Sequence, residues 1–205
     1  MTVMPKIHHG VSFITNPEAL SVFRDPACAA TIWSRTPKPG LQQWIDQLGP
    51  GVLPKWREIL DVEAVREAAL DACEEAGTPD CAERTTLLDD MQDLASAFAD
   101  LMQTSFVQFR LDVIKTNACR RFHLDAVTGR LICTYRGTGT QYGVSLNGEE
   151  PSTIETVPNF DPILLRGSLW PTVPDAGVLH RSPPIEGTRE TRLVMVLDTV
   201  SDDEE

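Results

Sequence analysis

The sequence predicts an α+β fold in which an antiparallel β-barrel, or jelly roll, is braced by an N-terminal helical segment. The spacing of the apolar residues supports this prediction, because its period is helical before Gln103 and changes to two soon afterwards. Several short apolar runs separated by turn residues then follow, as is typical of antiparallel barrels and sandwiches.

The length of 205 residues suits one domain, because such a chain can bury one good core but is short for two. We therefore expect a single domain over residues 1–205. Its parts would be a mainly helical N-terminal segment (1–103), a barrel core that carries the functional site (104–199) and a disordered acidic tail (200–205).

The first sixty residues are interrupted by prolines, so only short elements are expected there. Asn16 is placed to cap a helix that begins at Pro17, with Glu18 in its first turn. Residues 29–35 are expected to form a short strand, and residues 40–49 a short helix.

Two longer helices are predicted next. Asp61 would cap a helix that runs to about Ala76, with apolar residues at spacings of three and four. Asp80 would cap the second helix, because Glu83 follows three residues later in a capping-box arrangement. These helices would form a hairpin that covers one face of a sheet.

Strands are predicted wherever the period becomes two. Val107, Phe109, Leu111 and Val113 alternate with polar residues and indicate a strand with one solvated face. Further strands are expected over residues 130–135, 152–157, 163–170 and 191–197, with turn residues between them.

The charge balance disfavours two kinds of partner. There are 30 acidic and 18 basic residues, and the net charge of −12 disfavours a nucleic acid or an anionic membrane. No apolar stretch approaches the roughly 20 residues that span a bilayer, and the first ten residues lack the apolar core of a signal peptide. We expect a cytoplasmic protein that acts on a small molecule or a peptide.

The five cysteines include no CxxC pair, which argues against a disulfide framework and a zinc ribbon. Reduced thiols are therefore expected. Two alternatives concern Cys119 and Cys133, which could pair across a hairpin or supply a soft ligand that favours zinc.

The candidate site begins with His123 and Asp125, two residues apart in what we interpret as an extended segment. Their side chains would leave the same face of a strand. His180 is the only histidine downstream, and fifty-five residues separate it from Asp125, a spacing that suits a double-stranded β-helix barrel. Two imidazoles and a carboxylate form a facial triad that binds Fe(II) and leaves positions open for other ligands, although zinc and manganese accept the same ligands.

A basic residue on the last strand would complete such a site. Arg192 shares a strand face with Val194 and Val196, so a buried guanidinium there would need an anion such as a carboxylate. We favour Arg192 for this role over the nearby Arg189.

Three other residues could contribute. Thr134 and Tyr135 follow the first two ligands on the next strand and could hydrogen-bond a co-substrate carboxylate, with packing in the core as the equal alternative for Tyr135. Arg121 lies two residues before His123 and could bind an anionic substrate or orient Asp125.

The order HxD, distal His and later Arg resembles the Fe(II)/2-oxoglutarate dioxygenase superfamily, and HRSPPIEGTRETRLVMVLD resembles the distal-histidine segment of its prolyl-hydroxylase branch. The runs CRRFHLDAVTGRLICTYRGTGTQY, LLRGSLWP and HRSPP resemble a family of uncharacterised bacterial proteins of about the same length. The resemblance to the superfamily implies iron bound by His123, Asp125 and His180. It also implies 2-oxoglutarate held by Arg192 or Arg189.

The leading hypothesis is therefore an oxygenase-like protein that uses Fe(II) and 2-oxoglutarate to hydroxylate or oxidise a substrate. The competing hypothesis is a non-enzymatic, cupin-like metal-binding protein of zinc or iron homeostasis. A third reading makes His123 and His180 hydrogen-bonded structural residues of a barrel that binds no metal.

Overall fold

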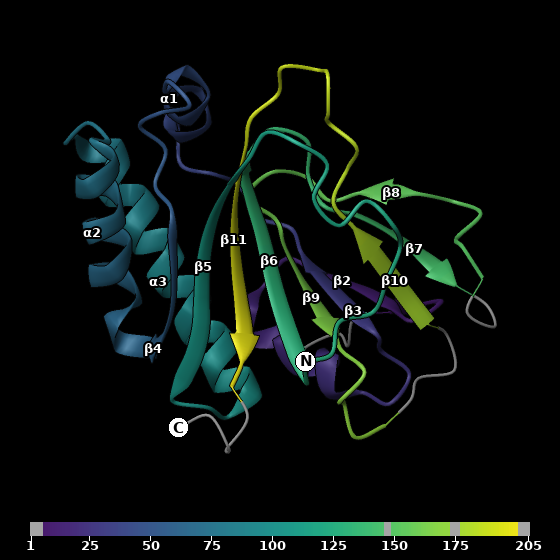
Figure 1. Cartoon of the computed structure of the whole chain (residues 1–205). Coiled ribbons are helices and arrows are strands. Elements are labelled where there is room, and N and C mark those ends of the chain that lie inside the picture. The colour runs from purple at the N-terminus through teal and green to yellow at the C-terminus, as the bar shows by residue number, and fades with distance from the viewer. Residues whose placement is uncertain (1–5, 146–148, 173–176, 201–205) are drawn as a thin grey trace.

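Two β-sheets face each other in the computed structural model, which describes residues 6–145, 149–172 and 177–200 (Figure 1). The larger sheet has eight strands in the order β1 (Ile7–His8), β2 (Val11–Ile14), β3 (Ala30–Trp33), β9 (Pro162–Arg166), β6 (Gly129–Arg136), β11 (Arg192–Thr199), β5 (Phe106–Ile114) and β4 (Trp56–Asp61). The smaller sheet has the order β10 (Gly177–Arg181), β7 (Gln141–Ser145) and β8 (Glu155–Thr156).

The space between the sheets holds an apolar core. Ile132, Val194 and Val196 from the larger sheet meet Tyr142 and Val178 from the smaller one, and all five are buried. Because side chains alternate along a strand, Ile132, Val194 and Val196 point into this core, while their neighbours in sequence point to the other face of the large sheet. The cleft described below is lined in part by Ile132, Val194 and Val196 of this core.

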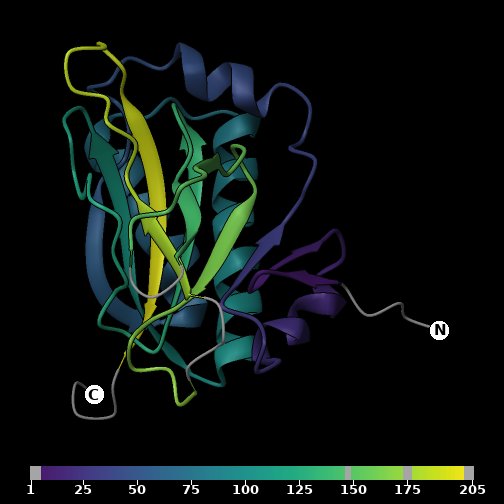
Figure 2. The same cartoon turned by 90° about the vertical axis from the view of Figure 1, so that its right-hand side faces the viewer.

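The remaining residues of the same strands face the helices. Leu131, Met195 and Leu197 contact a second core that includes Leu87 and Phe98 of α3 (Ala82–Met102). The helix α2 (Val65–Ala76) packs beside α3. Figure 2 shows α3 behind the large sheet, on the side away from β10.

The N-terminal segment contributes strands β1–β4 to the large sheet in addition to its helices. Asn16 caps as predicted, since its Oδ1 accepts a hydrogen bond of 3.0 Å from Glu18 N, but the helix η1 (Pro17–Arg24) is of the 3-10 type. The short helix α1 (Leu41–Gln47) also forms within its expected range.

The predicted caps of the two longer helices differ from those observed. Asp61 ends β4 and caps the short 3-10 helix η2 (Val62–Ala64), which leads into α2. Asp80 does not cap α3, because Cys81 occupies the cap position without a side-chain hydrogen bond. The Asp80 carboxylate instead pairs with Arg84 at 2.5 Å, one turn into the helix.

The strands expected over 107–113, 130–135 and 191–197 form as β5, β6 and β11, whereas β7 and β10 were not expected. The strand expected over 163–170 ends at Arg166, and the one expected over 152–157 is only β8. Residues 201–205 of the predicted tail lie outside the described residues. Within residues 6–145, 149–172 and 177–200, no helix is both long and apolar enough to cross a membrane.

Candidate metal centre

The segment between β5 and β6 carries His123 and Asp125 and lies along the free edge of β10. It is not a regular strand, contrary to our prediction, and it pairs with β10 through a single β-bridge between His123 and His180. The two residues exchange backbone hydrogen bonds of 3.0 Å, from His123 N to His180 O, and 3.2 Å in the reverse direction. This pairing brings the early and late ligand candidates together.

The three side chains converge as predicted. Asp125 Oδ2 lies 3.1 Å from Nε2 of His180, and Asp125 Oδ1 lies 3.4 Å from Nε2 of His123. One ligand atom from each residue lies within 4.8 Å of the other two. In the part of the chain that the structure describes, no other three His, Cys, Asp or Glu side chains form such a group.

Local contacts orient the first imidazole. His123 Nδ1 lies 2.9 Å from the backbone oxygen of Arg121, so its proton is donated there and Nε2 is left for a metal. The hydrogen bond to Asp125 raises the pKa of His123. Burial lowers the pKa of His180, which favours the neutral imidazole that metals bind.

Asp125 is held as an anion. Its burial alone would raise the pKa, but His123, His180 and Arg130 outweigh this effect and hold the pKa of Asp125 well below its usual range. Its Oδ1 lies 2.5 Å from Nη1 of Arg130, whereas Oδ2 is buried and has His180 Nε2, at 3.1 Å, as its close polar neighbour. That second oxygen is the natural donor to a cation.

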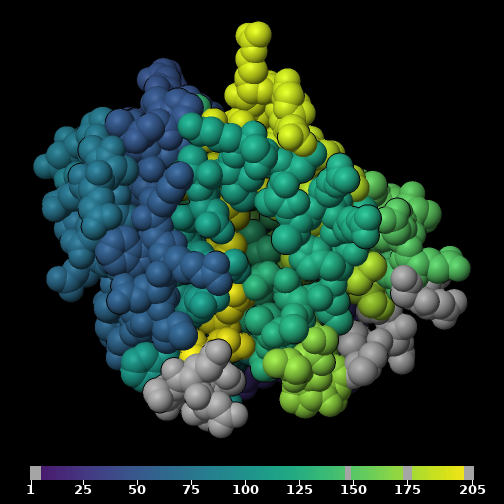
Figure 3. All heavy atoms as spheres, viewed as in Figure 1, coloured from purple at the N-terminus to yellow at the C-terminus, as the bar shows by residue number. Residues whose placement is uncertain are grey.

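A cleft of about 130 Å³ adjoins the triad, and its apolar walls come from the core between the sheets. In Figure 3 a recess opens at the centre of the molecule, with yellow atoms of the C-terminal segment inside it. The cleft is lined by residues that include His123, Arg130, Ile132, His180, Arg192 and Val194.

Arg192 reaches this cleft from β11 and is 1% exposed. Its Nε donates to the Thr138 oxygen at 2.6 Å, and Nη2 lies 3.5 Å from Thr134 Oγ1. Its Nη1 is buried without a hydrogen-bond partner among the described residues. Burial lowers the pKa of Arg192 to about 10, so the guanidinium remains charged at neutral pH.

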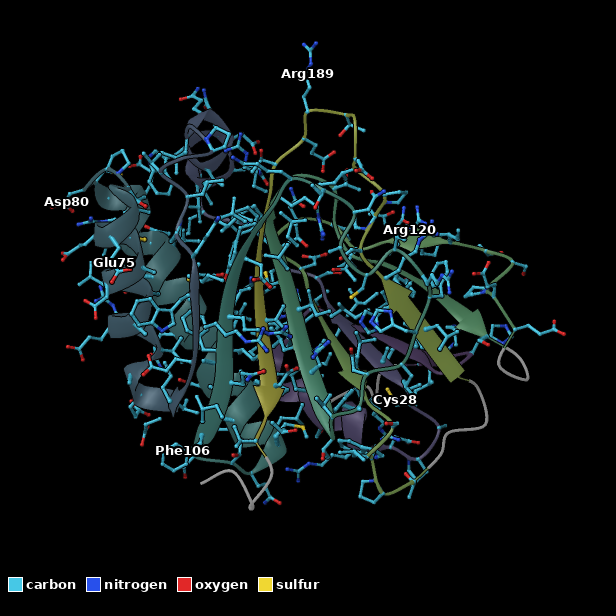
Figure 4. All side chains as sticks on the ribbon, in the orientation of Figure 1. Cys28, Glu75, Asp80, Phe106, Arg120 and Arg189 are labelled. Atoms are coloured by element: carbon cyan, nitrogen blue, oxygen red, sulfur yellow. The ribbon has the colours of Figure 1, made fainter. Side chains whose placement is uncertain are left out.

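Arg189 does not line this cleft. It is exposed in the connection between β10 and β11, and Figure 4 shows its side chain projecting away from both sheets. Of the two arginines that the sequence offered, only Arg192 lines the cleft that His123 and His180 also line.

Tyr135 points to the opposite side of the large sheet from Thr134. It is fully buried in the helix-facing core, where its hydroxyl donates to Asp90 Oδ2 at 2.9 Å. Thr134 therefore adjoins the cleft through its contact with Arg192, whereas Tyr135 does not. The Arg121 side chain is exposed, and its contact with the site is through its backbone oxygen.

The cysteines stay apart from the metal ligands. All five are free, so the pairing of Cys119 with Cys133 does not occur. Cys133 belongs to the helix-facing core, and Cys119 is exposed at the cleft without joining the ligand cluster. The structure gives no support to a sulfur ligand.

Sequence reasoning missed the contact between Arg130 and Asp125. It also missed Asp198, whose carboxylate pairs with Arg130 from β11. One signal was present, because Asp198 shares the strand face of Val194 and Val196, and a carboxylate on an inward face requires a cationic partner.

Residues 15–198 match the family described as "Protein of unknown function (DUF1826)". The chain belongs to the DUF1826 family. No curated protein matches this DUF1826 chain.

Solved structures resemble the DUF1826 chain at low identity. The dioxygenase for auxin oxidation 1 from Arabidopsis thaliana, in a binary complex with 2-oxoglutarate, is 10% identical and has a TM-score of 0.55, with 94% of this chain and 93% of that chain covered. The dioxygenase for auxin oxidation of rice is 14% identical and has a TM-score of 0.50, with 92% and 79% covered. These likenesses show the jelly-roll fold of 2-oxoglutarate dioxygenases.

Proposed function

We propose that this DUF1826 protein is a non-haem Fe(II)/2-oxoglutarate-dependent oxygenase that hydroxylates or oxidises a small molecule or a peptide. One observation carries the proposal. His123 and His180 line the same cleft as the charged, incompletely bonded Arg192, and Asp125 completes the ligand cluster beside the two imidazoles. The likeness in fold to 2-oxoglutarate dioxygenases supports it.

The donor set fits iron. Two imidazole nitrogens and one carboxylate oxygen are the ligands of a facial triad, which leaves positions open for a co-substrate. Asp125 Oδ2 is buried, and it lies 3.1 Å from Nε2 of His180, so two ligand atoms already point at the place where a cation would bind. His123, Asp125 and His180 would thus hold the metal, and the bound iron and 2-oxoglutarate would supply the oxidising chemistry.

The surroundings also fit a dicarboxylic co-substrate. Nη1 of Arg192 offers a donor inside a cleft where no acidic side chain of the described structure pairs with it. A carboxylate at this point would accept from Nη1, and Thr134 Oγ1 lies beside Nη2 for a further bond. We assign the far carboxylate of 2-oxoglutarate to Arg192 and Thr134, and not to Arg189 or Tyr135.

The chain's own residues would then position the reactants and exclude water. Ile132, Val194 and Val196 form an apolar wall beside the polar groups, which strengthens the ion pair at Arg192 by lowering the local dielectric. The hydrogen bond from His123 to the Arg121 oxygen fixes one ligand ring in the required orientation.

An anaerobic titration with Fe(II) followed by 2-oxoglutarate tests the proposal. A chelated 2-oxo acid should give a visible charge-transfer band, and His123→Ala should remove both the band and metal binding. His8→Ala is the matched control, because His8 is exposed on β1, outside the ligand cluster, and should leave the band unchanged.

Tight zinc binding with no such band would refute the oxygenase and favour the metal-binding alternative. Unaltered metal binding in His123→Ala would refute the assigned centre itself.

A further inference from the structure

We propose that Arg130 is a positioning residue that fixes the metal ligand Asp125, and that Asp198 fixes Arg130 in turn. The proposal rests on the metal centre of the proposed function. It adds an ion-pair network beneath that centre, formed by Asp125, Arg130, Asp198 and Arg110, and assigns this network its role.

The network joins three strands to the ligand segment. Arg130 on β6 bonds both oxygens of Asp198 on β11, through Nε to Oδ1 at 2.5 Å and through Nη2 to Oδ2 at 2.8 Å. Its remaining Nη1 lies 2.5 Å from Asp125 Oδ1. Arg110 on β5 adds a contact of 3.0 Å from Nη2 to Asp198 Oδ2. One guanidinium thus holds two carboxylates.

The network is largely withdrawn from solvent. The side chain of Asp198 is 5% exposed and that of Arg130 is 15% exposed. Buried pairs of this kind contribute little net stability, because desolvation offsets their attraction. Their value therefore lies in geometry, and the guanidinium fork is the side chain best suited to fixing carboxylates in one orientation.

Asp125 needs such fixing because its backbone does not lie in a strand. Backbone hydrogen bonds hold this segment, among them the His123 bridge, Ser168 N to Asp125 O at 2.8 Å and Leu169 N to Val127 O at 3.2 Å. These bonds fix the backbone but not the side-chain torsions of Asp125. The carboxylate would otherwise be able to rotate. The Arg130 contact anchors Oδ1 and presents Oδ2 toward His180, whose Nε2 lies 3.1 Å away.

Electrostatics and geometry predict opposite effects for the loss of Arg130. A cation beside a ligand carboxylate repels a divalent metal, so its removal alone should tighten metal binding. If Arg130 acts by orienting Asp125, its removal should weaken metal binding instead. Loss of an outer partner of a metal ligand commonly costs about 10- to 100-fold in affinity.

The test uses calorimetric titration of the full chain with Mn(II), a divalent ion that the same ligands accept and that resists oxidation. Arg130→Gln should weaken Mn(II) binding by about 10- to 100-fold. Arg130→Lys keeps the charge but not the fork, so it should also bind more weakly than the parent protein. Asp198→Asn should weaken Mn(II) binding as well, because it removes the anchor of Arg130.

Arg181→Gln is the matched control, because it removes a cation next to His180 in sequence. The Nε of Arg181 donates to Gln141 and not to Asp125. This variant should bind Mn(II) at least as tightly as the parent. Thermal unfolding of each metal-free variant identifies any that do not fold.

Folded Arg130→Gln that binds Mn(II) as tightly as, or more tightly than, the parent would overturn the inference while leaving the metal centre intact. A folded Asp198→Asn with parental affinity would overturn it independently. Absence of Mn(II) and Fe(II) binding by the parent would instead refute the proposed function.

Discussion

Replacing Arg192 with methionine should stabilise the ligand-free protein while impairing co-substrate binding. Burial lowers the pKa of Arg192 to about 10, and at about 1.4 kcal/mol per pH unit this drop corresponds to about 3 kcal/mol against the charged form. Methionine removes this penalty and fills much of the same space. The Thr138 oxygen loses its donor, however, which costs about 1 kcal/mol.

The net expectation is an increase of about 2 kcal/mol in the free energy of unfolding, within the range known for apolar replacement of buried charges. Urea denaturation of the metal-free protein measures it. The same variant should bind 2-oxoglutarate about 30-fold more weakly or worse, because a buried charged partner is lost. Its Mn(II) affinity should be unchanged, since Arg192 is not a ligand.

Arg189→Met is the matched control, because Arg189 is exposed in the β10–β11 connection and should alter neither quantity. Marked destabilisation by Arg192→Met, together with parental 2-oxoglutarate binding, would refute the reasoning. It would mean that the buried guanidinium is a structural donor and not a carboxylate-binding group.

Two further predictions concern the ligand segment and the cysteines. A Cβ at Gly167 would lie 1.9 Å from the Val127 oxygen and 2.8 Å from the Asp125 oxygen, so Gly167→Ala should displace the ligand segment and weaken Mn(II) binding by about 10-fold or more. Gly51→Ala is the control, because a Cβ at Gly51 has open space, and its Mn(II) affinity should be that of the parent protein. Equal Mn(II) affinities of the two variants would contradict this account. Burial raises the pKa of Cys133 to about 12, so at pH 8 this thiol is protonated and unreactive. Treatment of the native protein with iodoacetamide, followed by peptide mapping, should show that the exposed Cys119 is modified before Cys133. Equal labelling of the two cysteines would show that Cys133 is accessible.

Strand periodicity was the most informative part of the sequence. It placed Arg192 on the same face as Val194 and Val196, and the structure buries all three on the cleft side of β11. The same rule separates Thr134 from Tyr135, because neighbours on a strand face opposite sides. Of the two alternatives for Tyr135, the structure favours packing, because this side chain lies in the helix-facing core with its hydroxyl bonded to Asp90.

Other features depended on tertiary contacts that local patterns do not encode. The strands β7 and β10 are short and carry polar residues, so neither produced a clear alternating run. Asp125 and Arg130 are close in sequence, but their contact depends on the path of the irregular segment between β5 and β6. Asp198 joins them from a distant strand, and spacing alone does not indicate such a network.

The backbone bridge between His123 and His180 has a consequence for how the centre captures a cation. Each residue donates to and accepts from the other, so the two imidazoles are preassembled by the polypeptide before any ion arrives. A metal entering from solution therefore has little chain ordering to impose. We expect its capture to be limited by access and dehydration, with both rings shifting together whenever the edge of β10 moves.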